Sequence, residues 1–126
     1  MNILLITNNI LVYKKYRGIM DIIYKEDSSY LDILYYTRDL IHKGHELLTH
    51  PLSGSIKPNE TPFKTIILSK EKGNLDFQYL EIIEKSIQST EKFISNKATP
   101  NWSERVLEDF RVIDLSLIEN IIDLKT

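Results

Sequence analysis

The segment Ile3-Leu4-Leu5-Ile6-Thr7-Asn8-Asn9 decides the fold class of this chain. It begins with an uninterrupted apolar run, which is typical of a strand buried on both faces, as in a parallel sheet covered by helices. The polar residues that follow end this first strand. A secretory signal would need a basic start and an apolar run of about 7–15 residues. We therefore predict a cytoplasmic protein.

Outward from this strand, helical and extended patterns alternate along the chain. A short helix is predicted over residues 10–17 and a second strand over 19–24. A capping box formed by Ser29 and Asp32 predicts the start of the next helix, which ends at His42-Lys43-Gly44. The remaining predicted elements are a third strand at His45–Thr49, a fourth at Thr65–Ser69, a long helix capped by Asn74 and a last helix over residues 103–124.

This alternation predicts a single α/β domain over residues 1–126. We expect a small, open, mostly parallel four-stranded sheet of order 2-1-3-4, flanked by helices, with two long helices at the C-terminal end. The direction of the fourth strand stays open, because a parallel return needs a crossover of about a dozen residues or more.

The last predicted helix carries two apolar stripes, whereas a helix packed on one face of a sheet needs only one. The first stripe, expected to face the core, is Val106, Phe110, Ile113, Leu117 and Leu124. The second stripe is Leu115, Ile118 and Ile122. We expect the second stripe to face either the preceding helix or a second subunit, in a two-fold homodimer through the C-terminal helices.

Composition excludes several classes of function. The 126 residues include no cysteine, so disulfides, thiol catalysis and cysteine-based zinc sites are absent. The net charge is −2 and the basic residues are spread along the chain, so we predict no nucleic-acid partner. No apolar run approaches the roughly 20 residues of a membrane span, and we predict no membrane partner and no cofactor.

The segment His42–Pro62, HKGHELLTHPLSGSIKPNETP, is the most unusual part of the chain. It holds all three histidines, and the apolar periodicity stops after Pro51 for about a dozen residues. Irregular stretches of this length in a small domain are commonly functional or disordered. Three prolines and the Ser-Gly-Ser core favour a defined shape, and the alternative to a functional loop is a loop pinned only by its own prolines and side chains.

A histidine metal site is not predicted from this segment. His45 and His50 are five residues apart, which on a regular strand places them on opposite faces and about 16 Å apart. His42 falls in a helix end, where a cation suits the helix dipole. We expect three separate histidines.

Anion binding is the function that the segment favours. Ser53-Gly54-Ser55 offers small residues in a turn, where successive backbone amides can form an anion-binding concavity. Asn8 and Asn9 follow the first strand and His50 follows the third, so at a switch point of the sheet they would converge; the alternative for the two asparagines is a helix cap. The predicted ligand-binding residues are Asn8, Asn9, His50, Ser53, Gly54, Ser55, Lys57, Asn59 and Lys64.

The segment His42–Pro62, with the strand Lys64–Ser69 that follows it, resembles the GrdX family. Tyr30-Leu31-Asp32 and Arg38-Asp39-Leu40-Ile41 fit the same pattern. The resemblance is looser over the first strand and the C-terminal helices. It implies a small cytoplasmic protein of anaerobic bacteria, encoded beside the selenium-dependent glycine, sarcosine and betaine reductases. It carries no catalytic residue over to this chain.

Three hypotheses of function follow from these observations. The first is an accessory protein of glycine reductase-type metabolism that binds a small carboxylate or phosphate-bearing ligand through the loop 50–62. The second is a small enzyme in which His50 works with Ser53 or Lys57 in acid–base chemistry. The third is an assembly factor whose loop docks on a reductase subunit.

Overall fold

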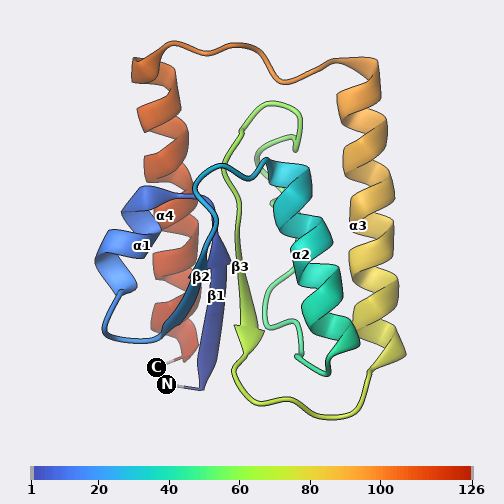
Figure 1. The fold of residues 1–126 in the computed structure, drawn as a ribbon. Coiled ribbons are helices and arrows are strands. Elements are labelled where there is room, and N and C mark those ends of the chain that lie inside the picture. Colours follow the sequence, from blue (N-terminus) through green and yellow to red (C-terminus); the bar gives the residue numbers. More distant parts are fainter. Residues whose placement is uncertain (1, 126) are drawn as a thin grey trace.

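The protein is a layered α/β structure, described here for residues 2–125 from a computed structural model. Figure 1 shows the sheet between two helical layers, with α1 and α4 on one side and α2 and α3 on the other. The elements are β1 (Ile3–Thr7), α1 (Ile10–Tyr16), β2 (Asp21–Tyr24), α2 (Tyr30–His42), β3 (Thr65–Ser69), α3 (Phe77–Asn96) and α4 (Glu104–Lys125). No helix within residues 2–125 is long and apolar enough to cross a bilayer.

The sheet has three strands in the described part of the chain, in the order β2-β1-β3. β1 pairs with β2 in parallel, with Leu4 opposite Asp21, and with β3 in antiparallel, with Leu5 opposite Ile67. The prediction of a mostly parallel, four-stranded sheet is therefore wrong. No helix lies between α2 and β3, and antiparallel pairing needs no crossover helix.

The predicted third strand, His45–Thr49, forms only an isolated antiparallel bridge between Leu47 and Leu68. It lies along the outer side of β3, where the Leu48 N–H donates to the Ile67 carbonyl at 2.9 Å. The predicted order 2-1-3-4 is wrong for this reason, because residues 65–69 take the place beside β1. The centre of β3 is apolar and fully buried, whereas segment 45–49 carries polar residues that suit a sheet edge.

The apolar run of β1 is buried on both faces, as predicted. Successive side chains of a strand point to opposite faces, and this alternation divides the core in two. One cluster joins Leu4 and Ile6 to α2 and α3. The other cluster joins Leu5 to α1 and α4.

Helix α4 packs on the sheet through its second stripe, which the sequence predicted to face the preceding helix or a second subunit. Ile118 and Ile122 are 3% and 5% exposed and contact the cluster around Leu5. Ile113 and Leu124, which were expected in the core, are 40% and 88% exposed. Both stripe assignments are therefore wrong, and Ile118 and Ile122 are not free to join a second subunit.

The ends of α2 are confirmed in detail. Ser29 and Asp32 form the predicted capping box, with both reciprocal hydrogen bonds at 3.0 Å. Gly44 follows the helix with φ = 103°, a conformation that favours glycine. The start of α3 differs from the prediction, because Asp76 rather than Asn74 caps it, accepting from the Gln78 N–H at 2.8 Å.

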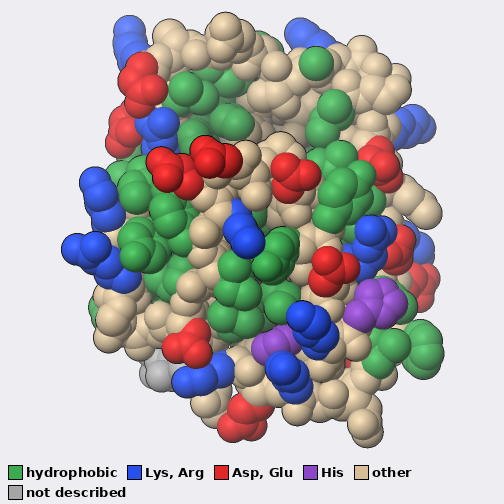
Figure 2. Space-filling view, viewed as in Figure 1, with side chains coloured by type: hydrophobic (Ala, Val, Ile, Leu, Met, Phe, Trp, Pro, Cys, Tyr) green, Lys and Arg blue, Asp and Glu red, His purple; other side chains and the backbone are tan. Residues whose placement is uncertain are grey.

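Surface charge on the face seen in Figure 2 is mixed in sign. Lysine and arginine side chains alternate there with aspartate and glutamate, and apolar side chains lie between them. A field of one sign attracts charged ligands over a distance. This face carries no such field, so selection of a charged ligand has to come from local contacts.

Candidate functional site

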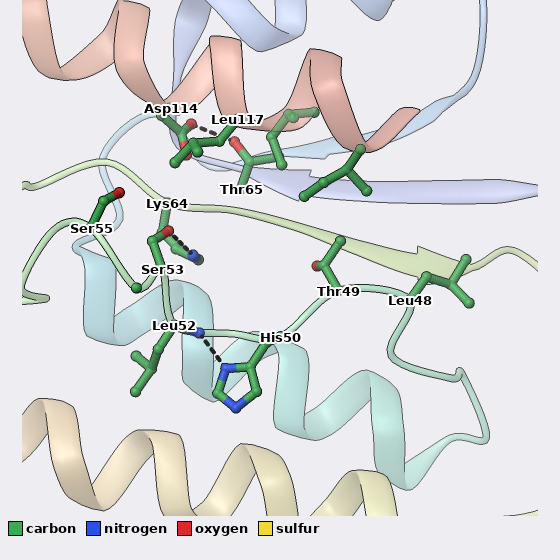
Figure 3. A pocket seen from close by; sticks show the side chains of 13 residues that line it. Leu48, Thr49, His50, Leu52, Ser53, Ser55, Lys64, Thr65, Asp114 and Leu117 are labelled. Carbon is green, nitrogen blue, oxygen red and sulfur yellow. Dashed lines mark hydrogen bonds between the residues drawn. The ribbon is translucent and has the colours of Figure 1, made fainter. Parts of the chain in front are cut away.

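A pocket of about 290 Å³ lies between the loop after segment 45–49, the start of β3 and the middle of α4. Figure 3 shows the side chains that line it. The lining residues with polar side chains are Thr49, His50, Ser53, Ser55, Lys64, Thr65 and Asp114. The apolar lining is Leu48, Leu52, Leu117, Ile118 and Ile121, with Gly54 completing the wall. The pocket therefore combines an apolar wall with a few polar groups, as small-molecule sites commonly do.

Lys64 is the buried cation of this pocket. Lys64 is only 5% exposed. Its Nζ donates to Ser53 Oγ at 3.3 Å and lies 5.6 Å from the centre of the Tyr30 ring. Burial lowers the pKa of Lys64 to about 8, while the charge of Asp114 opposes that shift. At pH 7 a group of this pKa is still roughly nine-tenths protonated, so Lys64 acts as a cation there.

Asn8 fixes the backbone that carries Lys64. Its Oδ1 accepts from the Lys64 backbone N–H at 2.9 Å. Its Nδ2 donates to the carbonyls of Ser28 and Pro62, at 2.9 and 2.8 Å. The polar atoms of the Asn8 side chain are thus engaged in holding two loops together, and Asn8 is not in the pocket lining.

Asp114 is the buried anion of the same pocket. It is 8% exposed, and its Oδ2 accepts from Thr65 Oγ1 at 2.7 Å and from Asn9 Nδ2 at 3.0 Å. Burial raises the pKa of Asp114, while these two hydrogen bonds and the charge of Lys64 act in the opposite direction. The donors therefore favour the ionised carboxylate against the effect of burial.

A directed chain of hydrogen bonds orients this carboxylate. The Asn9 N–H donates to Thr7 Oγ1 at 3.0 Å, and Thr7 Oγ1 lies 2.6 Å from Thr65 Oγ1. Because Thr65 donates its single hydroxyl proton to Asp114, Thr7 donates to Thr65. Asn9 also caps α1, its Oδ1 accepting from the Leu11 N–H at 3.1 Å. The predicted alternative of a helix cap is therefore confirmed for Asn9.

Lys64 and Asp114 line one pocket without forming an ion pair. Among the ion pairs of residues 2–125, none joins these two side chains. Figure 3 shows Lys64 directed to Ser53, and Asp114 directed to Thr65. The pocket thus holds a buried positive group and a buried negative group, each with its own neutral partners.

His50 lines the pocket through a ring that is hydrogen-bonded to its own loop. Its Nδ1 accepts from the Leu52 N–H at 3.0 Å, as Figure 3 shows. The lone pair of Nδ1 is therefore occupied, and Ser53 Oγ takes its hydrogen bond from Lys64 instead. The predicted pairing of His50 with Ser53 is not formed.

The other predicted ligand-binding residues lie apart from this pocket. Lys57 lines an adjoining groove, which shares Leu52 and residues 53–55 with this pocket and extends to Pro58 and Phe93. Asn59 is 7% exposed, its Nδ2 donates to the Lys97 carbonyl at 3.0 Å, and its Oδ1 has no partner within residues 2–125. Five of the nine predicted residues share the pocket lining, and they are His50, Ser53, Gly54, Ser55 and Lys64.

The three histidines lie in separate environments. His45 is buried, with Nδ1 2.8 Å from the Ser69 carbonyl oxygen, whereas His42 is exposed at the end of α2. Within residues 2–125, no three histidine, aspartate or glutamate side chains form a group suited to a metal ion.

Asp114, Thr65 and Thr49 are the polar residues of the pocket that reasoning from the sequence missed. One signal was present, because Asp114 precedes Ile118 and Ile122 at intervals of four residues, on the face that packs on the sheet. A carboxylate in line with a buried apolar stripe is rarely without a partner. Thr65 gave no such signal, since threonine is ordinary in strands.

Comparison with known proteins places the chain in a family. No curated protein and no solved structure matches it. The family model described as GrdX-like protein matches residues 4–123, which is nearly the whole chain. The protein therefore belongs to the GrdX-like family.

Proposed function

We propose that this protein binds a small carboxylate or phosphate-bearing ligand in the pocket beside Lys64, as an accessory protein of glycine reductase-type metabolism. The metabolic setting, with a reductase subunit as partner, comes from membership of the GrdX-like family. The ligand class comes from the pocket. The two parts of the proposal are independent of each other.

The observation that carries the ligand class is the burial of Lys64 without an ion pair. Placing an amine at 5% exposure disfavours its charged form, and a hydroxyl partner compensates this cost only in part. An anion seated against Nζ would supply the missing charge at low dielectric, where the attraction is strongest. Ser53 and Ser55 line the same pocket and offer further hydroxyl donors.

Isothermal titration calorimetry with acetate and with inorganic phosphate tests this proposal. We expect millimolar or tighter binding of one of them to the wild-type protein at pH 7, and at least about tenfold weaker binding to Lys64→Met. Lys57→Met is the matched control, because Lys57 is exposed and lines the neighbouring groove. Equal binding to wild-type protein and Lys64→Met, or none to either, would overturn the proposal.

Acyl transfer is a second candidate, favoured by the 3.3 Å distance between Lys64 Nζ and Ser53 Oγ. A serine beside a lysine of lowered pKa is a known form of activated nucleophile. A fluorophosphonate probe followed by mass spectrometry tests this chemistry. An adduct on Ser53 that is absent from Ser53→Ala and Lys64→Met would support it, whereas an unlabelled wild-type protein would exclude it.

A further inference from the structure

We infer that the ligand of the pocket is a small zwitterion, whose carboxylate is held by Lys64 and whose ammonium group is held by Asp114. This inference rests on the proposed function, because it names the ligand class of the same pocket. Its starting point is the pair of buried, opposite and unpaired charges that the pocket contains.

Each of the two charged side chains is hydrogen-bonded to neutral partners of its own. Lys64 Nζ donates to Ser53 on the loop, whereas Asp114 Oδ2 accepts from Thr65 and Asn9 across the pocket. A direct ion pair would satisfy both groups, and none is formed. A ligand with a positive and a negative end satisfies both at once, and each end replaces water with a charge-assisted hydrogen bond.

The second oxygen of Asp114 is available for such a contact. The side-chain hydrogen bonds from Thr65 and Asn9 both reach Oδ2, and the Thr65 backbone N–H also favours the ionised carboxylate. Asp114 lines the pocket, and neither of these side-chain hydrogen bonds occupies Oδ1. The chain from Asn9 through Thr7 and Thr65 holds the carboxylate in one orientation, which prepares Oδ1 to accept from an ammonium group.

Asp114 also disfavours ligands that carry only negative charge. A phosphate monoester would bring nearly two negative charges into a pocket that already contains a carboxylate, and like charges repel strongly at low dielectric. A plain carboxylate would neutralise Lys64 and leave Asp114 without a cation. The pocket therefore discriminates between the two ligand classes of the proposed function. It favours a carboxylate that carries an amine over a phosphate-bearing ligand.

The size and wall of the pocket limit the rest of the ligand. A volume of about 290 Å³ limits the site to a small ligand. Leu117, Ile118 and Ile121 form an apolar wall on α4. This wall suits methylene or methyl groups between the charged ends, rather than a hydroxylated sugar.

Calorimetry with a series of unbranched ω-amino acids, from glycine to 6-aminohexanoate, tests the inference. Each is compared at pH 7 with the carboxylate of the same length that lacks the amine. We expect one length to bind best to the wild-type protein, at least about tenfold more tightly than its carboxylate counterpart. Asp114→Asn keeps an oxygen that can accept from Thr65 and Asn9, and should bind both members of that pair equally.

Two controls separate the charge effect from damage to the fold. Asp109→Asn changes an exposed carboxylate on the same helix and should keep the wild-type preference for the amino acid. Circular dichroism checks that each variant is folded. If Asp114→Asn does not fold, the comparison between amino acid and carboxylate on the wild-type protein decides by itself.

The possible results distinguish this inference from the proposed function. If the wild-type protein binds carboxylates as tightly as amino acids of the same length, the zwitterion is excluded and the proposed anion site stands. If it binds phosphate more tightly than every amino acid, the zwitterion is also excluded. If it binds neither carboxylates nor amino acids nor phosphate, both proposals are wrong.

Discussion

Lys64 and Asp114 occupy positions where a charged side chain costs stability. Burial lowers the pKa of Lys64 from 10.5 to about 8 and raises the pKa of Asp114, so in each case the folded protein disfavours the charged form. The shift at Lys64 corresponds to roughly 3 kcal/mol. A protein selected for stability alone would place apolar residues here, and sites that act on ligands commonly carry such a cost.

The pH dependence of stability should report the burial of Lys64. Between about pH 8 and 10.5 the unfolded state binds the proton that the folded state has lost, so the free energy of unfolding rises with pH. Relative to Lys64→Met, the wild-type protein should therefore gain roughly 2 kcal/mol between pH 7 and 9.5 in urea unfolding. Lys57→Met, at an exposed position of the same loop, is the control. Parallel pH curves for the wild-type protein and Lys64→Met would contradict the prediction.

Asn8→Ala should lower stability and loosen the site without removing a pocket residue. The change deletes three side-chain hydrogen bonds of a buried residue, each worth about 0.5–1.5 kcal/mol, so we expect a loss of roughly 2–4 kcal/mol. Urea unfolding measures this loss. Ligand binding should weaken as well, because Asn8 holds the Lys64 backbone. A loss of binding at full stability would instead indicate direct contact with the ligand.

Among the secondary-structure elements, the end of α2 is the most constrained connection. Gly44 has φ = 103°, its carbonyl accepts from the Gly73 N–H at 2.9 Å, and a Cβ atom at Gly44 would collide with the Gly73 carbonyl oxygen. Gly18 also has a positive φ, of 80°, but a Cβ atom there would meet no atom within 4 Å. A substitution at Gly18 therefore tests backbone strain alone, whereas a substitution at Gly44 tests backbone strain together with a steric clash.

Gly18→Ala should cost only the left-handed backbone conformation, roughly 1–2 kcal/mol. Gly44→Ala should cost clearly more, because the loop after β3 would also have to move away from the end of α2. Thermal unfolding of both variants measures the difference. Equal losses would show that the loop carrying Gly73 moves aside easily.

Helix α4 offers a second comparison, because one of its faces packs on the sheet and the other does not. Ile118→Asp would place a carboxylate among Leu5, Val12 and Ile67, and we expect the variant not to fold at 25 °C. Ile113→Asp changes a residue that is 40% exposed and should unfold within about 1 kcal/mol of the wild-type protein. Circular dichroism distinguishes the two. A folded, monomeric Ile118→Asp protein would show that this face is not part of the core.

At the scale of the whole molecule, the pocket exists only where three distant segments meet. Segment 48–55, the start of β3 and the middle of α4 each supply part of its wall. Figure 1 shows that α4 covers the sheet face opposite α2 and α3, so the C-terminal helix closes a site that begins in the first half of the chain. Ligand binding should therefore stabilise segments far apart in the sequence.

Hydrogen exchange measured by mass spectrometry tests this coupling. Saturation with the best-binding ω-amino acid or carboxylate should slow exchange in segment 48–55 and in α4 around residues 114–121, because a ligand stabilises what it contacts. Exchange in α3 beyond residue 85 should stay unchanged. Lys64→Met is the control, and protection confined to the loop would show that α4 takes no part in the site.

The sequence predicted several features because they depend on neighbouring residues alone. The burial of β1 on both faces follows from its unbroken apolar run, and both ends of α2 follow from Ser29, Asp32 and Gly44. The segment after α2 predicted membership of the GrdX family, and the match of the family model to residues 4–123 confirms it. Capping, turn formation and burial are encoded within a few residues, so local patterns were sufficient for them.

Only the tertiary structure decided the strand order, the face of α4 that meets the sheet and the partners of Lys64. Residues 65–69 and 45–49 both read as strands, and their competition for the place beside β1 is settled by long-range burial. Asp114 and Lys64 line one pocket although they are 50 residues apart in the sequence. The antiparallel pairing of β3 with β1, which positions Lys64, was not specified by the sequence pattern. Pairing between distant segments depends on the free energy of the whole packed core, which no local pattern records.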